Sequence, residues 1–324
     1  MEDWKIYRGD GRTDPERIAS LPDPPPWRSF SHLAESRAKT FLPPPGVVEV
    51  VNAALYLRRP ILVTGDPGTG KSSLVYAVAR ELGLGEVLTW PINSRSTLTE
   101  GLYLYDAVAR LRQASLERTR ATEGREIGSL VEDIGRYIKL GPLGTSFLAQ
   151  KRPRAVLIDE IDKSDVDLPN DLLHVLENGE FEIPELVRIA EENPIVEVAV
   201  SDAGSARQPI EQGRVLCGVF PFIVITSNGE RDLPPAFLRR CLRIDLPNPE
   251  ADRLREIVLR HLKAADEEKL TDLLAKFDER RKQGMVLATD QLLNAFYMLD
   301  RGNAMTAEER TLIERILLRE LDAR

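Results

Sequence analysis

Apolar positions along the chain follow two spacings, which together predict alternating strands and helices from residue 41 to about residue 246. Short apolar runs bounded by glycine or polar residues are typical of buried parallel strands. Such runs occupy residues 60–64, 87–90, 155–158 and 222–226, with a shorter one at 242–246. Apolar residues at helical spacing predict helices over residues 46–57 and 72–82, and helical segments are expected between the other strands. This alternation predicts an α/β fold with a parallel sheet flanked by helices.

Beyond the sequence Pro247-Asn248-Pro249 the pattern becomes almost entirely helical. Helical spacing covers residues 250–263, 266–281, 289–299 and 306–321. The N-terminal forty residues are polar instead and contain a Pro-rich stretch at 21–26. We therefore expect three parts: a Pro-rich N-terminal extension (1–40), an α/β domain (41–248) and a small C-terminal helical domain (249–324).

The Pro-rich extension has two open interpretations. Consecutive prolines favour extended backbone and cannot continue a helix, so the segment could be an arm laid on another surface. Trp27 and Phe30 would then be its apolar anchors. A disordered leader is the equal alternative.

Composition narrows the class of protein. The longest nearly apolar stretch, residues 215–225, is too short to span a bilayer and is predicted to be a buried strand. No signal peptide is visible at Met1, and two cysteines with three scattered histidines indicate neither a disulfide framework nor a zinc site. A cytoplasmic location is expected. The net charge of −8 makes nucleic acid an unlikely main partner.

The strongest motif follows the first predicted strand and fits the phosphate-loop pattern G-x-x-x-x-G-K-[ST]. Its residues are Gly65, Asp66, Pro67, Gly68, Thr69, Gly70, Lys71 and Ser72, with Ser73 next in the chain. Glycines allow backbone N–H groups to approach phosphates, and the following helix directs its positive end at the anion. Lys71 supplies charge for the β- and γ-phosphates, and the Ser72 hydroxyl can ligate Mg²⁺.

Polar residues also follow two other predicted strands. Asp159 and Glu160 end the run at 155–158, and Asn228 follows the run at 222–226. Ligands of open α/β sheets bind at the carboxyl ends of the strands. Asp159 is therefore predicted to hold Mg²⁺, Glu160 to polarise the attacking water, and Asn228 to orient that water near the γ-phosphate.

Two adjacent arginines, Arg239 and Arg240, end a short predicted helix that begins after Leu233-Pro234. An arginine supplied to a neighbouring subunit's nucleotide neutralises charge that develops on the transferred phosphoryl group. An exposed pair that bridges surface carboxylates would be the reading if the other motifs were absent.

Together these motifs resemble the AAA+ ATPases, and specifically their MoxR branch. The similarity covers roughly residues 41–246, including the runs Asp159-Glu160-Ile161-Asp162-Lys163-Ser164 and Leu176-Glu177-Asn178-Gly179-Glu180-Phe181. It implies a P-loop AAA+ core with a helical lid, ATP and Mg²⁺ as cofactors, and a ring, expected to be a hexamer. By position it assigns Asn228 as first sensor and Arg240 as arginine finger, although Arg239 occupies a position that is often acidic in relatives.

The resemblance also implies two insertions, within residues 97–140 and 185–215, and a basic second sensor near the start of the third lid helix. No lysine or arginine occurs between Lys282 and Arg301, so the second sensor is missing from its expected place. The leading hypothesis is an ATP-driven, chaperone-like remodeller of a partner protein. The alternatives are a nucleotide switch within a larger, possibly defence-related complex and, less favoured, a nucleic-acid motor subunit that could use GTP.

Overall fold

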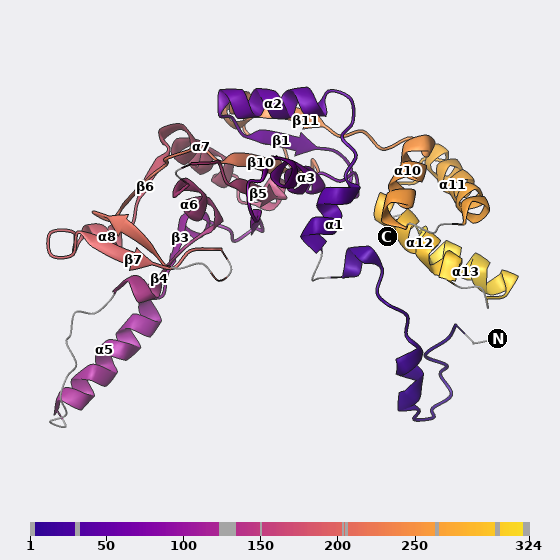
Figure 1. Ribbon diagram of the computed structural model, residues 1–324, viewed down its shortest axis with the longest axis horizontal. Helices are drawn as coiled ribbons and strands as arrows, with labels where there is room; N and C mark the ends of the chain where they lie inside the picture. Colours follow the sequence, from indigo (N-terminus) through magenta and orange to yellow (C-terminus); the bar gives the residue numbers. More distant parts are fainter. Residues whose placement is uncertain are drawn as a thin grey trace. The chain divides into compact units, whose positions relative to one another are not determined.

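A computed structural model of the protein describes residues 4–29, 33–122, 134–149, 151–202, 204, 207–262, 266–301 and 305–319. Its centre is a five-stranded parallel sheet in the order β11-β1-β10-β5-β2 (Figure 1). The strands are β1 (Ile61–Thr64), β2 (Leu88–Pro91), β5 (Ala155–Asp159), β10 (Phe222–Thr226) and β11 (Leu242–Asp245). All five predicted strands are therefore confirmed, to within a residue or two at their ends.

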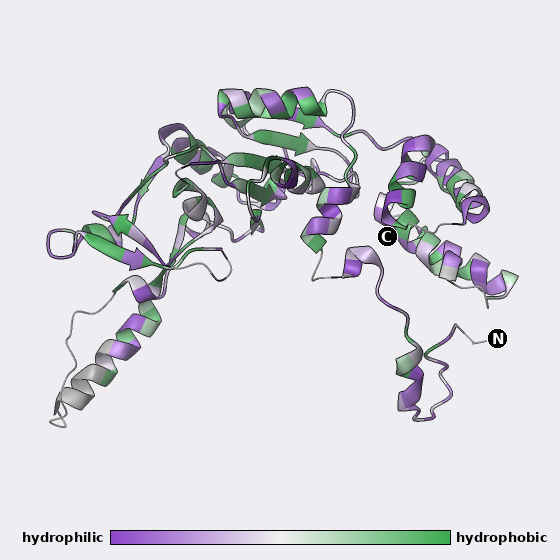
Figure 2. Cartoon of the chain, viewed as in Figure 1, coloured by the Kyte–Doolittle hydropathy of each residue, from purple (hydrophilic) through white to green (hydrophobic). Residues whose placement is uncertain are grey.

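Burial explains why these runs form the sheet. Every residue of β10 is buried, and only the last residue of β1 and of β5 is partly exposed. Strands covered on both faces need apolar residues at every position, and β1 and β10 are accordingly hydrophobic along their length (Figure 2). Helix α2 (Val47–Leu57) packs against β1 and β11. The predicted α/β fold with a parallel, helix-flanked sheet is confirmed.

The prediction of one strand over residues 215–225 was wrong. The apolar run is divided between β9 (Arg214–Leu216) and β10, which belong to different sheets. Gly218 and Pro221 lie in the connecting segment. Since proline lacks the N–H that a central strand must donate, Pro221 is placed just before β10 rather than within it.

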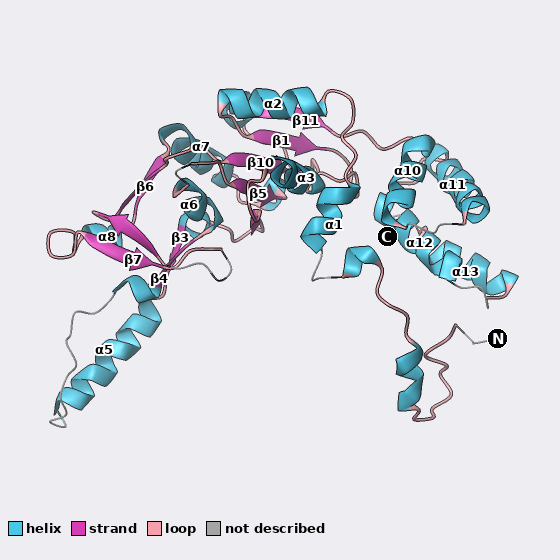
Figure 3. Cartoon of the chain, viewed as in Figure 1, coloured by secondary structure: helices cyan, strands magenta, loops and turns pink. Residues whose placement is uncertain are grey.

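Helical segments lie between the strands of the central sheet, as expected, and two antiparallel sheets lie there as well (Figure 3). The first sheet lies within the predicted insertion at 97–140, whereas the second begins at Glu180, before the insertion predicted at 185–215. The first insertion holds α4 (Leu98–Leu102), β3 (Tyr103–Tyr105), α5 (Ala107–Thr122) and β4 (Ile138–Leu140), with β3 paired to β4. The second sheet has the order β6-β9-β8-β7 and is formed by β6 (Glu180–Glu182), β7 (Ile195–Val198), β8 (Gln208–Glu211) and β9. Helix α8 (Pro184–Val187) follows β6.

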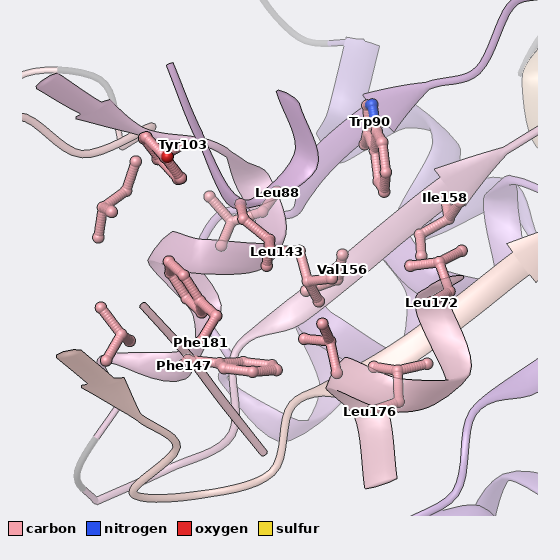
Figure 4. Close-up of a cluster of buried hydrophobic side chains, with 14 of the residues drawn as sticks. Leu88, Trp90, Tyr103, Leu143, Phe147, Val156, Ile158, Leu172, Leu176 and Phe181 are labelled. Atoms are coloured by element: carbon pink, nitrogen blue, oxygen red, sulfur yellow. The ribbon is translucent and has the colours of Figure 1, made fainter. Parts of the chain in front are cut away.

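One apolar core joins these insertions to the central sheet. Figure 4 shows Phe147 from α6 (Pro142–Phe147) beside Phe181 from β6, and their ring centroids are 6.2 Å apart. Val156 of β5 and Leu176 of α7 (Leu168–Asn178) belong to the same cluster. The insertions are thus part of a common folding unit with the sheet.

The described residues of the C-terminal part form four helices, as predicted. They are α10 (Ala251–His261), α11 (Glu267–Lys282), α12 (Thr289–Arg301) and α13 (Ala307–Leu317). Leu254, Val258, Phe277 and Phe296 are almost completely buried in a core that these helices share. None of the helices in the described ranges combines the length and apolar character needed to cross a bilayer.

The Pro-rich N-terminal segment is docked, which confirms the arm and excludes the disordered leader over the described residues. The indole Nε1 of Trp27 donates a hydrogen bond of 2.9 Å to Oδ1 of Asn294 on α12. The Trp27 ring meets His261 and Tyr297 edge-on, with both centroid distances 5.8 Å. The Tyr297 hydroxyl donates to the backbone oxygen of Asp23. Phe30, the other predicted anchor, lies outside the described residues.

The chain forms two compact units. One comprises Met1–Pro44, Gly65–Ala77 and Leu246–Arg324; the other comprises Pro45–Thr64 and Val78–Asp245. Helix α1 (Leu33–Thr40) packs against α10 within the first unit. Helix α3 (Ser73–Leu82) begins in the first unit and continues in the second. The division at residues 40 and 248 that the sequence suggests stays a prediction.

The burial of His261 against Trp27 leads to a prediction about stability and pH. Burial lowers the pKa of His261 to about 4, and its Nδ1 has no hydrogen-bond partner among the described residues. Between about pH 6.5 and pH 4 the unfolded chain binds this proton and the folded chain does not. The free energy of unfolding should therefore fall by about 1–3 kcal/mol as the pH is lowered through this window, and be unaffected by His261 above it.

Urea unfolding at pH 7 and pH 5, followed through tryptophan fluorescence, measures this change. His261→Gln cannot titrate and serves as the control, because the carboxylates that also titrate near pH 4 are common to both proteins. An equal loss of stability in the two proteins would contradict the assignment to His261.

Candidate functional site

The phosphate loop leaves β1 directly, since Gly65 follows the last strand residue Thr64. Three of its glycines have positive φ: 139° at Gly65, 79° at Gly68 and 90° at Gly70. Side chains disfavour this backbone region, so the turn requires glycine at these positions. The motif thus adopts the bent backbone that the sequence predicts.

Two of these glycines also lie too close to neighbouring atoms to carry a side chain. A Cβ on Gly65 would lie 2.5 Å from the backbone oxygen of Leu246, which no side chain tolerates. A Cβ on Gly68 would lie 2.8 Å from Cβ of Ala288 and 3.0 Å from the backbone nitrogen of Thr289. The loop is therefore packed against the start of α12, within the first unit.

Lys71 is held within the loop. Its ammonium donates hydrogen bonds to the backbone oxygens of Gly65, at 2.7 Å, and Asp66, at 2.9 Å. The Thr69 hydroxyl donates to the same Asp66 oxygen at 2.9 Å. Since α3 begins at Ser73, one residue later than predicted, the loop ends at the positive pole of a helix. A cation, a helix terminus and an open glycine turn fit a polyphosphate chemically.

The strand-end carboxylates are positioned by a threonine of the neighbouring strand. The Thr226 hydroxyl donates a 2.6 Å hydrogen bond to Oδ1 of Asp159 and accepts one of 2.8 Å from the backbone N–H of Glu160. Strands β10 and β5 are paired in parallel, with Ile225 opposite Ile158, which brings their ends together. Glu160 itself has φ 63° and ψ 51°, a left-handed conformation that is uncommon for a residue with a side chain. The chain turns sharply at this residue.

Asn228 lies beside the same carboxylates. Its Nδ2 lies 3.4 Å from Oε1 of Glu160. The buried carboxylate of Asp162 fixes the segment by accepting hydrogen bonds from the backbone N–H groups of Asn228, at 2.9 Å, and Glu230, at 3.0 Å. The structure thus brings together Asp159, Glu160 and Asn228.

Sequence reasoning missed the roles of Thr226 and Asp162. Thr226 is the hydroxyl at the end of an otherwise apolar strand, and Asp162 is a buried carboxylate that follows the core residue Ile161. Buried polar groups are almost always hydrogen-bonded, so a polar residue at a buried position indicates a partner that must be found. Periodicity could identify such positions but could not name the partners.

The predicted arginine pair ends α9 (Pro235–Arg240). Arg240 forms an ion pair with Glu177 of α7, and its backbone oxygen accepts a 3.0 Å hydrogen bond from Nε of Arg59. Arg239 is exposed, and its backbone oxygen also accepts a hydrogen bond from Arg59. Both arginines are therefore anchored through their backbone, while only Arg240 has a side-chain ion pair among the described contacts.

The phosphate loop belongs to one compact unit, and the cluster of Asp159, Glu160 and Asn228 belongs to the other. The prediction that Lys71 and Asp159 act on one ligand stays a prediction. Within each group the geometry agrees with its expected chemistry.

A parallel sheet with a glycine loop after β1 and carboxylates at the end of β5 defines the class of P-loop nucleotide-binding proteins. The profile of the AAA domain (dynein-related subfamily) matches residues 60–241, which is more than half of the chain. The chain therefore belongs to this family and to the AAA+ class.

Comparison with other proteins adds little to this family assignment. The solved structure of a candidate ATPase from Cytophaga hutchinsonii ATCC 33406 is similar at 12% identity and a TM-score of 0.38. The similarity covers 71% of this chain and 54% of that protein, so the chain spans about half the length of the protein it matches. No curated protein sequence matches the chain.

The bridging hydroxyl of Thr226 generates a stability prediction. Thr226→Val keeps the shape of the side chain but removes the acceptor of the Glu160 N–H and the hydroxyl that donates to Asp159. We expect the free energy of unfolding to fall by about 1–3 kcal/mol, the cost of an unsatisfied buried polar group. Chemical denaturation measures it. Thr226→Ser retains the hydroxyl and should lose less than half as much; equal losses would mean that packing, not the hydrogen bonds, is responsible.

Proposed function

We propose that this protein is a Mg²⁺-dependent ATPase that binds ATP through the loop of residues 65–73. The observation that carries the proposal is the loop itself: three glycines at positive φ around an anchored Lys71, followed by a helix start. Lys71 neutralises the β- and γ-phosphates, and the loop N–H groups bind phosphate oxygens. The family assignment supports the same chemistry.

The chain offers hard oxygen ligands of the kind that Mg²⁺ prefers, the Ser72 hydroxyl and the Asp159 carboxylate. When bound, Mg²⁺ neutralises charge on the phosphate oxygens. Glu160 would accept a proton from the attacking water, and Asn228 would orient that water through its amide. The 3.4 Å separation between the Asn228 amide and the Glu160 carboxylate supports their acting together.

We further propose that the subunits assemble into a ring, expected to be a hexamer, and remodel or activate a partner protein in a chaperone-like way. The support is the resemblance of the sequence to the MoxR branch and the exposed arginine pair. The ion pair of Arg240 with Glu177 is about half exposed on both sides, at 41% and 51%. Such pairs contribute only about 0–1 kcal/mol, so the Arg240 side chain can exchange Glu177 for a neighbouring subunit's phosphate.

A second candidate function is a nucleotide switch with slow or partner-regulated turnover, and one observation favours it. The start of α12 lies against Gly68 and supplies Thr289 and Asp290. No lysine or arginine occurs between Lys282 and Arg301, so the basic second sensor is missing from its expected place. Brisk hydrolysis by the isolated protein would argue for the remodelling motor instead. A nucleic-acid motor is less favoured because the net charge is −8.

Substitutions at the loop and at the carboxylate should separate binding from turnover. Lys71→Ala should abolish ATP binding, because the loop loses its cation. Glu160→Gln should bind ATP with little change and hydrolyse it about 10²–10⁴ times more slowly, the usual contribution of a general base. Equilibrium binding of a fluorescent ATP analogue and steady-state phosphate release measure the two properties.

Glu86→Gln is a matched control, an exposed carboxylate outside the cluster. Turnover by Glu160→Gln at the wild-type rate would refute the assignment of the base. Unimpaired binding by Lys71→Ala would refute the phosphate loop.

The arginine pair generates a prediction about assembly. If Arg240 acts across a subunit interface, Arg240→Ala should lower turnover about 10³–10⁵-fold while leaving ATP binding intact. Mixing it with Lys71→Ala, which is inactive for a different reason, should restore activity at mixed interfaces. Arg239→Ala, tested in parallel, identifies which side chain reaches the phosphate.

Native mass measurement with a non-hydrolysable ATP analogue should show a ring. A strict monomer that still hydrolyses ATP would rule out action in trans.

A further inference from the structure

The last turn of helix α9 carries both predicted arginines, and the chain leaves this helix without a glycine. Cys241 follows in an extended conformation, with φ −97° and ψ 143°, and β11 begins at Leu242. The last four carbonyls of a helix have no N–H partner within it. In α9 these include the backbone oxygens of Arg239 and Arg240, which therefore need partners from outside the helix.

Arg59 supplies a donor to each of these two oxygens. Its Nε donates a 3.0 Å hydrogen bond to the backbone oxygen of Arg240, and its Nη2 donates to that of Arg239. A guanidinium is planar and holds its donors in fixed directions, so binding two oxygens together fixes the orientation of the helix end as well as its distance. Hydrogen bonds from a charged donor are also stronger than neutral ones.

The backbone around Arg59 is held on both sides. Arg58 ends α2 in a left-handed conformation with φ 55°, and the N–H of Arg59 donates a 3.2 Å hydrogen bond to the oxygen of Ala54. Pro60 comes next and restricts the residue before it to extended backbone. The oxygen of Pro60 accepts a 2.9 Å hydrogen bond from the N–H of Leu242. Arg59 therefore reaches α9 from a fixed position between α2 and the central sheet.

The arginine beside Arg59 binds elsewhere. Arg58 is exposed, and its Nη1 donates to the oxygen of Leu55 within its own helix. Arg59, by contrast, bonds with residues 180 and 181 positions later in the chain. Arg58 is thus a matched control for the loss of a guanidinium at this end of α2.

The arginine pair needs a rigid backbone if one of its side chains is to act on a neighbouring subunit's nucleotide, because misplacement by about 1 Å can cost about 10²-fold in rate. The ion pair of Arg240 with Glu177 is exposed and weak, so it does not supply this rigidity. We propose that Arg59 is a positioning residue that holds the end of α9 and so directs the arginine pair towards the next subunit. The inference rests on the proposed ring ATPase and adds the residue that aligns its arginine.

A thiol at the end of α9 reports on the same contact. Cys241 is 5% exposed, and burial raises its pKa to about 12. The positive charge of Arg59 acts in the opposite direction, since it favours the thiolate. Removing Arg59 would therefore slow alkylation of Cys241 if the helix end stayed closed, and would accelerate it if the helix end came loose.

Arg59→Ala should lower kcat for ATP about 10- to 100-fold and leave ATP binding intact, because the phosphate loop is untouched. Arg59→Lys keeps the charge but cannot bind both oxygens from one plane, so its kcat should fall between those of Arg59→Ala and the wild type. Arg58→Ala should retain the wild-type rate. Steady-state phosphate release and equilibrium binding of a fluorescent ATP analogue measure these properties. An unchanged kcat in Arg59→Ala would overturn the proposal.

Mixing of variants distinguishes misplacement of the arginine from a general loss of structure. Arg59→Ala keeps its own nucleotide site, so mixing it with Lys71→Ala, whose arginines are intact, should restore turnover. Arg240→Ala (or Arg239→Ala, if that residue proves to reach the phosphate) shares the defect of Arg59→Ala, so this mixture should stay slow. The double variant of Arg59 and the active arginine should be no slower than the single arginine variant. Failure of the first mixture to recover, or a further loss in the double variant, would contradict the assignment.

Alkylation of Cys241 tests the contact without hydrolysis. Nucleotide-free protein is pulsed with iodoacetamide and analysed by peptide mass spectrometry, with the other cysteine, Cys217, as internal reference. Arg59→Ala should label Cys241 about tenfold faster than the wild type, because the helix end loses hydrogen bonds from a charged donor, and Arg58→Ala should match the wild type. Equal or slower labelling in Arg59→Ala would refute the proposal. If labelling responds as expected but no variant hydrolyses ATP, the proposed function fails while the contact of Arg59 with α9 stands.

Discussion

The register of three parallel strands determines which side chains of this protein can meet. Strand β10 lies between β1 and β5, with Val63 opposite Thr226 and Ile225 opposite Ile158. Because the strands end at nearly the same level, one hydroxyl of β10 can bind both the Asp159 carboxylate and the backbone of Glu160. A slip of one residue would turn Thr226 to the opposite face of the sheet and separate these groups. The apolar burial that fixes the register therefore also fixes the chemistry at the strand ends.

The elements that the sequence predicts best are those whose sequence pattern is local. The strands of the central sheet, the glycine turn and the described C-terminal helices each follow from an apolar run, a motif or a helical spacing. The grouping of Glu160 with Asn228 also follows, because carboxyl ends of parallel strands share one edge. The sequence does not reveal that Thr226 and Asp162 hold this group together. Their hydrogen bonds join residues more than sixty positions apart, which only the three-dimensional structure brings into contact.

The two insertions show where pattern reasoning fails. Strand β9 and strand β10 lie in one apolar stretch, and their assignment to different sheets depends on a break at Gly218 and Pro221 that composition alone did not reveal. Strands β6, β8 and β9 are short and have one buried residue each, so they lack the continuous apolar run that marks β1, β5 and β10. The contacts of Trp27 could not be predicted either. The prolines indicate an extended arm but do not show which helices it contacts.

The docked arm has a consequence for the order in which the protein folds during synthesis. Trp27 bonds with a residue 267 positions later in the chain, and the first compact unit combines both ends of the chain with the segment Gly65–Ala77. The segments Pro45–Thr64 and Val78–Asp245, by contrast, are synthesised before the C-terminal helices. The sheet can thus form early, whereas the arm must wait with its indole exposed until α10 and α12 emerge. During that interval Trp27 lacks the partners Asn294 and Tyr297 that it has in the folded protein.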